Sequence, residues 1–286
     1  MRPSAGLVKS ALILCALGAG GTAWAEGAIA WRDGFAAAQS AAAASGRPIM
    51  AVFRSAGCGP CAEFETETLA DPAVLELAQR FESVHINAMI EREVANRYLV
   101  SAFPSVKFLS ADGALVYDTQ GLLLAEAFVE VMQRALDGHA ALLRARRAAA
   151  EADDPPSAQA ALAIARDFAF ARQHAEAAAW AAQALDAADQ DAADLQAEAL
   201  LIRGTSLVEI GEPYDAIDAL MAHLQIAPSG DGAWRARVAL GYAWVQTGEN
   251  QAGAQLLQAV VDAGDAPGEV REEAERLLGW AGVAVN

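Results

Sequence analysis

Two cysteines separated by two residues are the strongest chemical signal in the chain. Cys58 and Cys61 flank Gly59-Pro60, and thiols at this spacing lie one helical turn apart, where they can close a disulfide. The apolar run 49–53 before them predicts a buried strand, and a helix is expected to begin just after Cys58. Unpaired N–H groups and the dipole at that helix N-terminus favour a thiolate. We therefore expect Cys58 to attack a substrate and Cys61 to resolve the mixed disulfide.

The cysteine count limits what this pair can be. The chain has three cysteines, and Cys15 lies in an N-terminal stretch that we expect to be removed. A zinc site would need two further ligands, and no second cysteine pair supplies them. Covalent haem would need a histidine after the second cysteine, where the chain has Ala62. We expect redox chemistry without a cofactor or a metal; the alternatives are a degenerate structural remnant of a redox site and a metal site.

The N-terminus has the features of a secretory signal peptide. A basic start and an apolar run over 11–17 precede Ala23-Trp24-Ala25, which matches the small-x-small rule for cleavage. The run is too short to span a membrane, and no later stretch is long and apolar enough. A lipid anchor at Cys15 is the alternative, although bulky Leu14 argues against it. We therefore expect a signal peptide over 1–25 and a periplasmic or secreted mature protein.

Charge divides the chain into two parts. The whole chain has a net charge of −17, with about −4 over 26–150 and about −15 over 151–286. Such acidity argues against nucleic acid or an anionic membrane as a partner. It also fits the simpler role of keeping an alanine-rich helical array in solution. We predict two domains, 26–150 and 151–286, with their boundary at Asp153-Asp154-Pro155-Pro156.

The first domain resembles the thioredoxin superfamily between about residues 31 and 138. Cys-Gly-Pro-Cys at 58–61 matches the redox motif of that family, and Ala102-Phe103-Pro104-Ser105 stands where the family places a cis-proline. The resemblance implies an α/β thioredoxin-like fold with a redox-active Cys58–Cys61 disulfide. The residues that would contact a substrate segment are Gly59, Pro60, Phe103 and Pro104. For Phe103, a place in the core is the alternative.

Several positions depart from the family pattern. Where many thioredoxins carry a buried aspartate, this chain has Val52, so a proton acceptor is missing. His85 takes about the place of the lysine that partners this aspartate. We interpret His85 as a satisfied core or edge residue, with proton transfer from the second cysteine as the alternative. Arg54 and Glu63 either tune the charge at Cys58 in opposite directions or are solvated bystanders.

Local patterns in the first domain predict alternating helices and strands. An alanine-rich segment predicts a leading helix from Trp31 to Ser45, which Gly46 and Pro48 end. The other expected elements are a helix from Asp71, a strand over 83–87, a helix over 91–99, a hairpin of 106–109 with 115–117, and a helix over 125–150.

The second domain resembles a tetratricopeptide repeat array. One unit places Gly204 in its first helix and Gly211 at the turn seven residues later, and the next unit repeats this spacing with Gly241 and Gly248. Residues 161–187 have the same two-helix form without the glycines, and 269–280 would cap the array. The resemblance implies three helix pairs that together bury a face no single pair could cover.

Two hypotheses for function follow. The first is an exported thiol-disulfide oxidoreductase that acts on protein disulfides by dithiol exchange, with repeats that dock a client or an electron donor. The second is a non-catalytic adaptor or holdase-like binding protein on a thioredoxin scaffold. Both fit an α/β thioredoxin-like domain followed by an all-α repeat domain, with protein partners and neither nucleic acid nor membrane.

Overall fold

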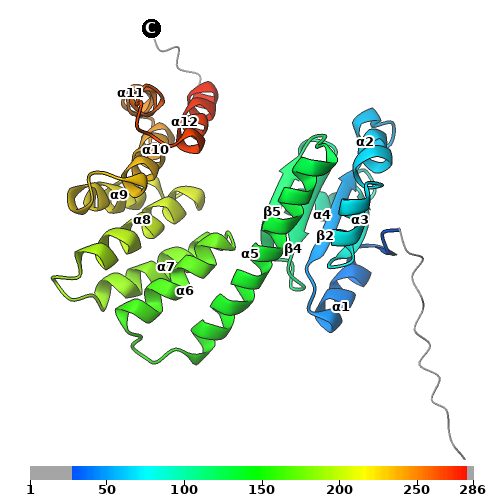
Figure 1. Ribbon diagram of the computed structural model, residues 1–286, viewed down its shortest axis with the longest axis horizontal. Coiled ribbons are helices and arrows are strands. Elements are labelled where there is room, and N and C mark those ends of the chain that lie inside the picture. Colours follow the sequence, from blue (N-terminus) through cyan, green and yellow to red (C-terminus); the bar gives the residue numbers. More distant parts are fainter. Residues whose placement is uncertain (1–27, 282–286) are drawn as a thin grey trace, which may run out of the picture.

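The computed structural model describes residues 28–281. The signal peptide expected over 1–25, with Cys15, lies outside the described residues. Figure 1 shows an α/β part and an all-helical part, joined by one long helix, α5 (Ala125–Glu151). Among the described helices, none is both long and apolar enough to cross a bilayer.

A five-stranded sheet forms the centre of the α/β part, in the order β1-β3-β2-β4-β5. The strands are β1 (Trp31–Arg32), β2 (Ile49–Arg54), β3 (Glu82–Asn87), β4 (Ser105–Leu109) and β5 (Leu115–Gln120). β3 pairs in parallel with β1 and β2, whereas β4 runs antiparallel to β2 and β5. The predicted buried strand, the second strand and the hairpin are all confirmed.

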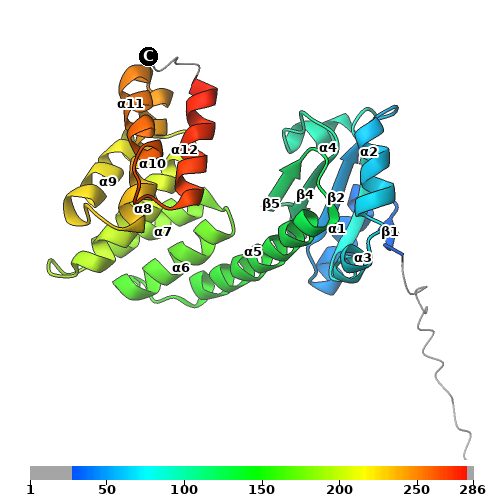
Figure 2. The same cartoon turned by 45° about the horizontal axis from the view of Figure 1, so that its top comes forward.

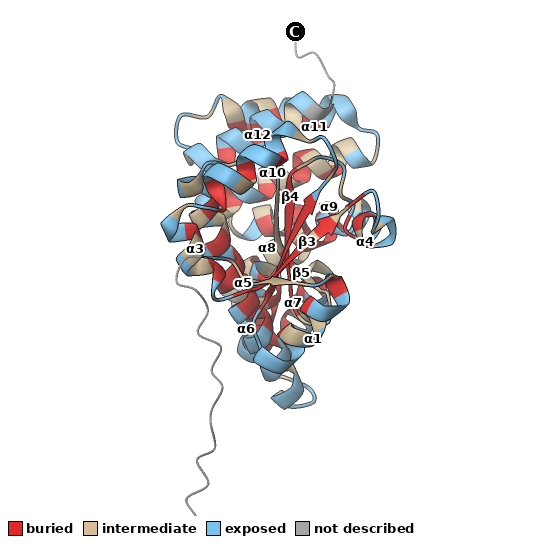
Figure 3. Cartoon of the chain, turned by 90° about the vertical axis from the view of Figure 1, so that its right-hand side faces the viewer, coloured by how far each residue is buried: buried red, intermediate tan, exposed pale blue. Residues whose placement is uncertain are grey.

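Helices cover both faces of this sheet. Two of them, α1 (Phe35–Ser45) and α4 (Arg92–Arg97), pack on one face. The opposite face carries α2 (Gly59–Glu63), its continuation as a π-helical segment η1 (Phe64–Thr68), α3 (Pro72–Ala78) and α5. The two layers explain why the first five residues of β2 are apolar: Met50 and Val52 belong to one core cluster, and Ile49, Ala51 and Phe53 to the other. Figure 3 shows the buried strands between the exposed outer surfaces of the helices.

The predicted start of the leading helix was wrong. Trp31 and Arg32 pair with Ser83 and Val84 as strand β1, and the helix begins at Phe35. Gly34 separates the two elements with φ of 84°, a backbone conformation that does not continue a helix. Pairing with β3 therefore prevails over the alanine-rich pattern, because tertiary contacts override a weak local propensity.

Seven helices form the C-terminal part of the described chain. They are α6 (Ala158–Phe170), α7 (His174–Asp186), α8 (Ala193–Glu209), α9 (Pro213–Ile226), α10 (Asp231–Gln246), α11 (Asn250–Val261) and α12 (Gly268–Ala281). Glycines lie where neighbouring helices approach closely. A Cβ on Gly204 would lie 2.6 Å from the Leu220 side chain, and one on Gly253 would overlap the carbonyl oxygen of Gly241. Close packing of α8 on α9 and of α10 on α11 therefore depends on residues without side chains.

The hydrophobic core is continuous across the predicted domain boundary. The cluster on the α5 face of the sheet contains Phe108 of β4 and Leu142 of α5, and extends to Ile164 and Phe168 of α6. Figure 2 shows α5 packing along the sheet and then running on to α6. Removing the chain after Asp153 would expose this shared core, so the full chain is the appropriate object for experiments.

A polar network also joins the two parts. Lys107 of β4, only 3% exposed, donates a hydrogen bond of 2.7 Å from Nζ to Oδ2 of Asp118 on β5. Arg172, in the turn between α6 and α7, donates from Nη1 to the other carboxylate oxygen, also at 2.7 Å. In the same turn, Gln173 donates to the carbonyl oxygen of Leu115 at 2.7 Å. Asp118 thus compensates a buried charge within the sheet and holds the first helix pair against β5.

Asp118→Asn should lower the free energy of unfolding by about 3 kcal/mol, because it leaves the buried Lys107 ammonium without a carboxylate. Chemical denaturation of the full chain measures the loss. Glu151→Gln is the matched control, since it removes the carboxylate of the exposed ion pair with Arg147, which should contribute about 0.5 kcal/mol or less. Equal losses in the two variants would contradict the role assigned to Asp118.

Candidate active site

The cysteine pair lies where β2 ends and α2 begins. β2 ends at Arg54, and Gly57 turns the chain with φ of 75°. Cys58 is the N-cap of α2, and its Sγ accepts a hydrogen bond of 3.2 Å from the backbone N–H of Cys61. Pro60 occupies the first turn of α2, where a missing N–H costs nothing. The predicted position of Cys58 at a helix start is thereby confirmed.

Cys58 and Cys61 form a disulfide with a Cα–Cα distance of 5.3 Å. The two sulfurs differ in exposure, because Cys58 is half-buried whereas Cys61 is only 5% exposed. An incoming thiol or disulfide can therefore reach Cys58, while Cys61 is shielded by its place one turn into the helix. This asymmetry suits an attacking and a resolving cysteine.

The peptide bond between Phe103 and Pro104 is cis, as the resemblance implied. The pairing of Phe53 with Ser105 places this bond at the same end of the sheet as the loop that leads to Cys58. Pro104 is buried, and Phe103 is half-buried against the core cluster beneath α1 and α4. The alternative place of Phe103 in the core therefore has direct support, while its contact with a substrate stays a prediction.

A cavity of about 550 Å³ opens beside the disulfide. Its lining comes from the β2–α2 connection, the first turns of the cysteine helix and the end of β3. The lining includes Arg54, Cys58, Gly59, Cys61, Glu65 and Asn87. Of the residues predicted to form the site, Cys58, Gly59 and Cys61 thus meet at one cavity, whereas Pro60, Phe103 and Pro104 are not part of its lining.

Glu65 is a residue of the site that sequence reasoning missed. Its Oε1 lies 2.8 Å from Nε2 of His85 and 3.5 Å from Nη1 of Arg54. The ring of His85 stacks on Trp31, with centroids 3.5 Å apart. His85 is thus a half-buried strand residue, as we interpreted it, but its Nε2 is not satisfied, because the close contact with Glu65 lacks hydrogen-bond geometry. The four-residue spacing between Cys61 and Glu65 was the available signal, because residues at that spacing share one face of a helix.

Arg54 and Glu63, which could either tune the charge at Cys58 or be solvated bystanders, have different positions. Arg54 lines the cavity, whereas Glu63 is exposed and is not part of the lining. Val52, at the position where many thioredoxins have an aspartate, is 1% exposed and packs in the core. The carboxylate at this cavity therefore comes from the helical segment that follows the cysteines, and not from the strand before them.

Iodoacetamide should alkylate Cys58 well before Cys61 when the reduced full chain is treated near neutral pH. The reason is that Cys58 combines access with the N-terminal end of α2, whereas Cys61 is buried. Peptide mapping by mass spectrometry after short exposure measures the order. Faster labelling of Cys61 would reverse the assignment of the attacking residue.

Comparison with known proteins agrees with this geometry. Residues 35–136 match a family model described as a thioredoxin-like domain. One similar solved structure is a DsbH oxidoreductase, with 19% identity and a TM-score of 0.34, covering 38% of this chain and 85% of that one. A Thermus thermophilus thioredoxin has 28% identity and a TM-score of 0.32, covering 34% of this chain and 79% of that one. The reduced C-terminal domain of Neisseria meningitidis DsbD has 22% identity and a TM-score of 0.31, covering 34% of this chain and 89% of that one. A search of curated proteins gave no match. The chain therefore contains a thioredoxin-like domain with a Cys58–Cys61 disulfide, followed by an all-helical region.

Proposed function

We propose that this protein is an exported thiol-disulfide oxidoreductase that acts on protein disulfides, in the periplasm or outside the cell. The observation that carries the proposal is a closed disulfide at a helix N-terminus with one accessible and one buried sulfur. The signal-peptide pattern over 1–25 supports export. The protein thiols or disulfides of a client and of an electron donor are the partners, and the chemistry needs no cofactor.

The reaction balances as two thiol-disulfide exchanges. The Cys58 thiolate attacks one sulfur of a client disulfide, so a mixed disulfide forms and one client thiolate leaves. Cys61 then loses its proton to water and attacks Sγ of Cys58, which releases the second client thiolate. The client gains two electrons and the protein is left with its Cys58–Cys61 disulfide. A dithiol partner must return two electrons for another turnover.

In this proposal Gly59, Pro60, Phe103 and Pro104 contact the client around the cysteines. Gly59 lines the cavity and adds no side chain that would obstruct it. The backbone before cis-Pro104 lies at the same end of the sheet, where an extended client segment can pair with it. The half-buried ring of Phe103 then presents part of its surface to the client.

The full chain should reduce a small model disulfide, such as oxidised glutathione, when a dithiol regenerates it. Cys58→Ser should abolish turnover, because it removes the attacking thiolate. Cys61→Ser should retain the first attack and accumulate the mixed disulfide, which mass spectrometry detects as an adduct at Cys58. A wild-type chain that neither reduces nor oxidises a disulfide would instead favour the non-catalytic adaptor.

The helical region serves, in our proposal, as a tetratricopeptide-like array that docks the client. Three successive helix pairs followed by α12 support this. The turns within the pairs also support it, because each contains one residue with positive φ: Arg172 in the first pair, Gly211 in the second and Gly248 in the third. The first pair keeps this turn conformation without a glycine, and the ion pair of Arg172 with Asp118 stabilises it.

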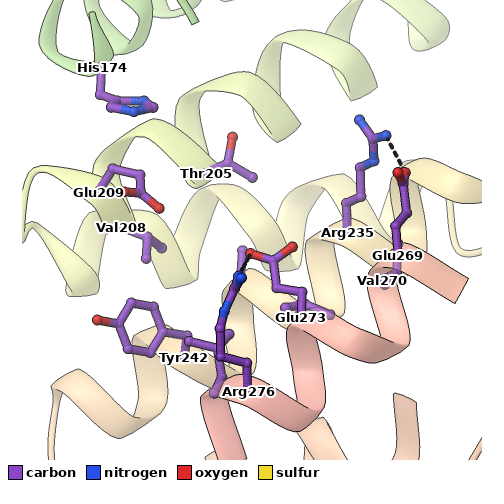
Figure 4. A pocket seen from close by; sticks show the side chains of 13 residues that line it. His174, Thr205, Val208, Glu209, Arg235, Tyr242, Glu269, Val270, Glu273 and Arg276 are labelled. Carbon is purple, nitrogen blue, oxygen red and sulfur yellow. Dashed lines mark hydrogen bonds and ion pairs between the residues drawn. The ribbon is translucent and has the colours of Figure 1, made fainter. Parts of the chain in front are cut away.

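A second cavity, of about 580 Å³, lies in this helical region. Side chains from α7, α8, α10 and α12 point toward it in Figure 4, and its lining includes His174, Tyr242 and the apolar residues Val208 and Val270. In the same lining, Arg235 pairs with Glu269 at 3.1 Å and Arg276 with Glu273 at 3.6 Å.

Glu209 is the acidic residue of this lining whose charge is not compensated. Its carboxylate is exposed and forms no ion pair with another residue of the described chain. Burial lowers the pKa of neighbouring His174, so the imidazole is neutral at pH 7 and does not balance Glu209. An unpaired carboxylate in a cavity that also has apolar lining is complementary to an extended client segment with a basic side chain beside an apolar one.

Glu209→Gln should lower kcat/KM about threefold for a disulfide peptide with a lysine-rich extension, and high salt should reduce the difference, because charge attraction at an exposed rim mainly speeds encounter. A peptide with the same disulfide and a glutamate-rich extension provides the comparison. Glu212→Gln is the matched control variant, since Glu212 is exposed nearby and does not line the cavity. Equal rates for both peptides with the wild-type chain, at low and high salt, would exclude charge-based docking by this region.

A further inference from the structure

The cavity beside the disulfide contains a fixed carboxylate that the exchange reaction described above does not use. Glu65 lines this cavity together with both cysteines, and its side chain is 27% exposed. Glu63 and Glu67 follow the cysteines on the same helical segment, but both are exposed and neither lines the cavity. Unlike Glu63 and Glu67, Glu65 therefore has its carboxylate at the cavity beside the disulfide.

Three neighbouring elements hold this carboxylate in place. His85 on β3 approaches Oε1 at 2.8 Å and Arg54 at the end of β2 approaches it at 3.5 Å. Trp31 on β1 stacks on the imidazole and limits its movement. Because its contacts come from the sheet, the carboxylate cannot turn toward solvent without losing them.

Glu65 is ionised at neutral pH. Burial opposes its ionisation, but the close contacts with His85 and Arg54 outweigh burial and lower the pKa of Glu65. Within the described lining of the cavity, Arg54 and Glu65 are the charged side chains. Their ion pair leaves Arg54 less able to attract a thiolate, while the carboxylate itself repels one.

The charge at this cavity bears on the redox equilibrium of the cysteine pair. At a pH above the pKa of the nucleophilic thiol, a lower pKa stabilises the reduced form, and a stabilised reduced form makes the disulfide a stronger oxidant. A nearby negative charge has the opposite effect, because it disfavours the thiolate and therefore the reduced form.

We propose that Glu65 sets the redox poise of the Cys58–Cys61 couple: its fixed carboxylate disfavours the Cys58 thiolate, favours the disulfide and makes the reduced protein a stronger reductant. This inference rests on the proposed function. Glu65 acts on the thiolate through its charge and position and takes no part in bond formation. In this arrangement His85 and Trp31 hold the carboxylate, and Arg54 opposes it.

The test compares two isosteric variants of the full chain, Glu65→Gln and Glu63→Gln. Both remove one carboxylate from the same helical segment, but only the first removes it from the cavity. The rate of Cys58 alkylation by iodoacetamide, followed as a function of pH, should rise about threefold or more at pH 7 for Glu65→Gln, corresponding to a shift of half a pH unit or more in the profile. Glu63→Gln should follow the wild-type profile.

A second measurement reads the equilibrium directly. At a fixed ratio of reduced to oxidised glutathione, and at a pH above the midpoint of both alkylation profiles, Glu65→Gln should hold a larger fraction of the cysteine pair in the reduced form than wild type, with the equilibrium constant changed by a factor of about three. Arg54→Gln should change both readouts in the opposite direction, because it removes the charge that attracts the thiolate.

The outcomes separate this inference from the proposed function. If Glu65→Gln and Glu63→Gln give the same alkylation profile and the same glutathione equilibrium, the inference is overturned, whatever the activity of the wild-type chain. If Glu65→Gln does not fold, Arg54→Gln still decides, because an unchanged or faster alkylation in that variant would also overturn it. Loss of disulfide turnover in the wild-type chain would affect the proposed function alone.

Discussion

The position of β2 at the centre of the sheet is the constraint on which the rest of the structure depends. β2 pairs with β3 on one side and β4 on the other, and its first five residues are fully or almost fully buried. Burying each large apolar side chain stabilises the fold by roughly 2 kcal/mol, so the strand cannot shift in register without a large loss. Because β2 is fixed, the end of the strand fixes Cys58, and the helix that follows fixes Cys61.

The same strand neighbours supply the chemical surroundings of the disulfide. β3 carries His85, which holds Glu65 at the cavity. β4 begins directly after cis-Pro104, so the segment proposed to pair with a client and the cysteines lie at one end of the sheet. Three adjacent strands thus bring together groups that lie far apart in the chain, and none of these groups has to be positioned by a long loop.

The helical region is attached to the sheet by apolar and polar contacts together. The core beneath α5 continues into α6, and the carboxylate of Asp118 links the sheet to Arg172 in the turn between α6 and α7. A region held by both kinds of contact keeps a defined orientation toward the cysteine end of the sheet. In the proposed function this orientation matters, because two linked binding sites strengthen each other only when both can be engaged at once.

Much of this architecture was predictable from local patterns. The apolar run before Cys58, the Asp71-Pro72 helix start and the glycine spacing after residue 199 each predicted an element that the structure contains, since strand burial, helix capping and close helix packing depend on residues near one another in sequence. The Cys-x-x-Cys spacing likewise predicted the disulfide. Trp31 was assigned to a helix because its pairing with β3 involves a strand about 50 residues away.

Sequence by itself therefore determined the chemistry of the cysteine pair and the type of nearly every element. Only the tertiary structure decided which charged groups line the same cavity as the cysteines. Glu63 and Glu65 are the same residue type and lie two residues apart, but of the two it is Glu65 that lines the cavity and contacts His85 and Arg54. The tertiary structure likewise decided that Asp118 pairs with Lys107 and Arg172. Electrostatic energy depends on distance in space and on burial, and neither can be read from separation along the chain.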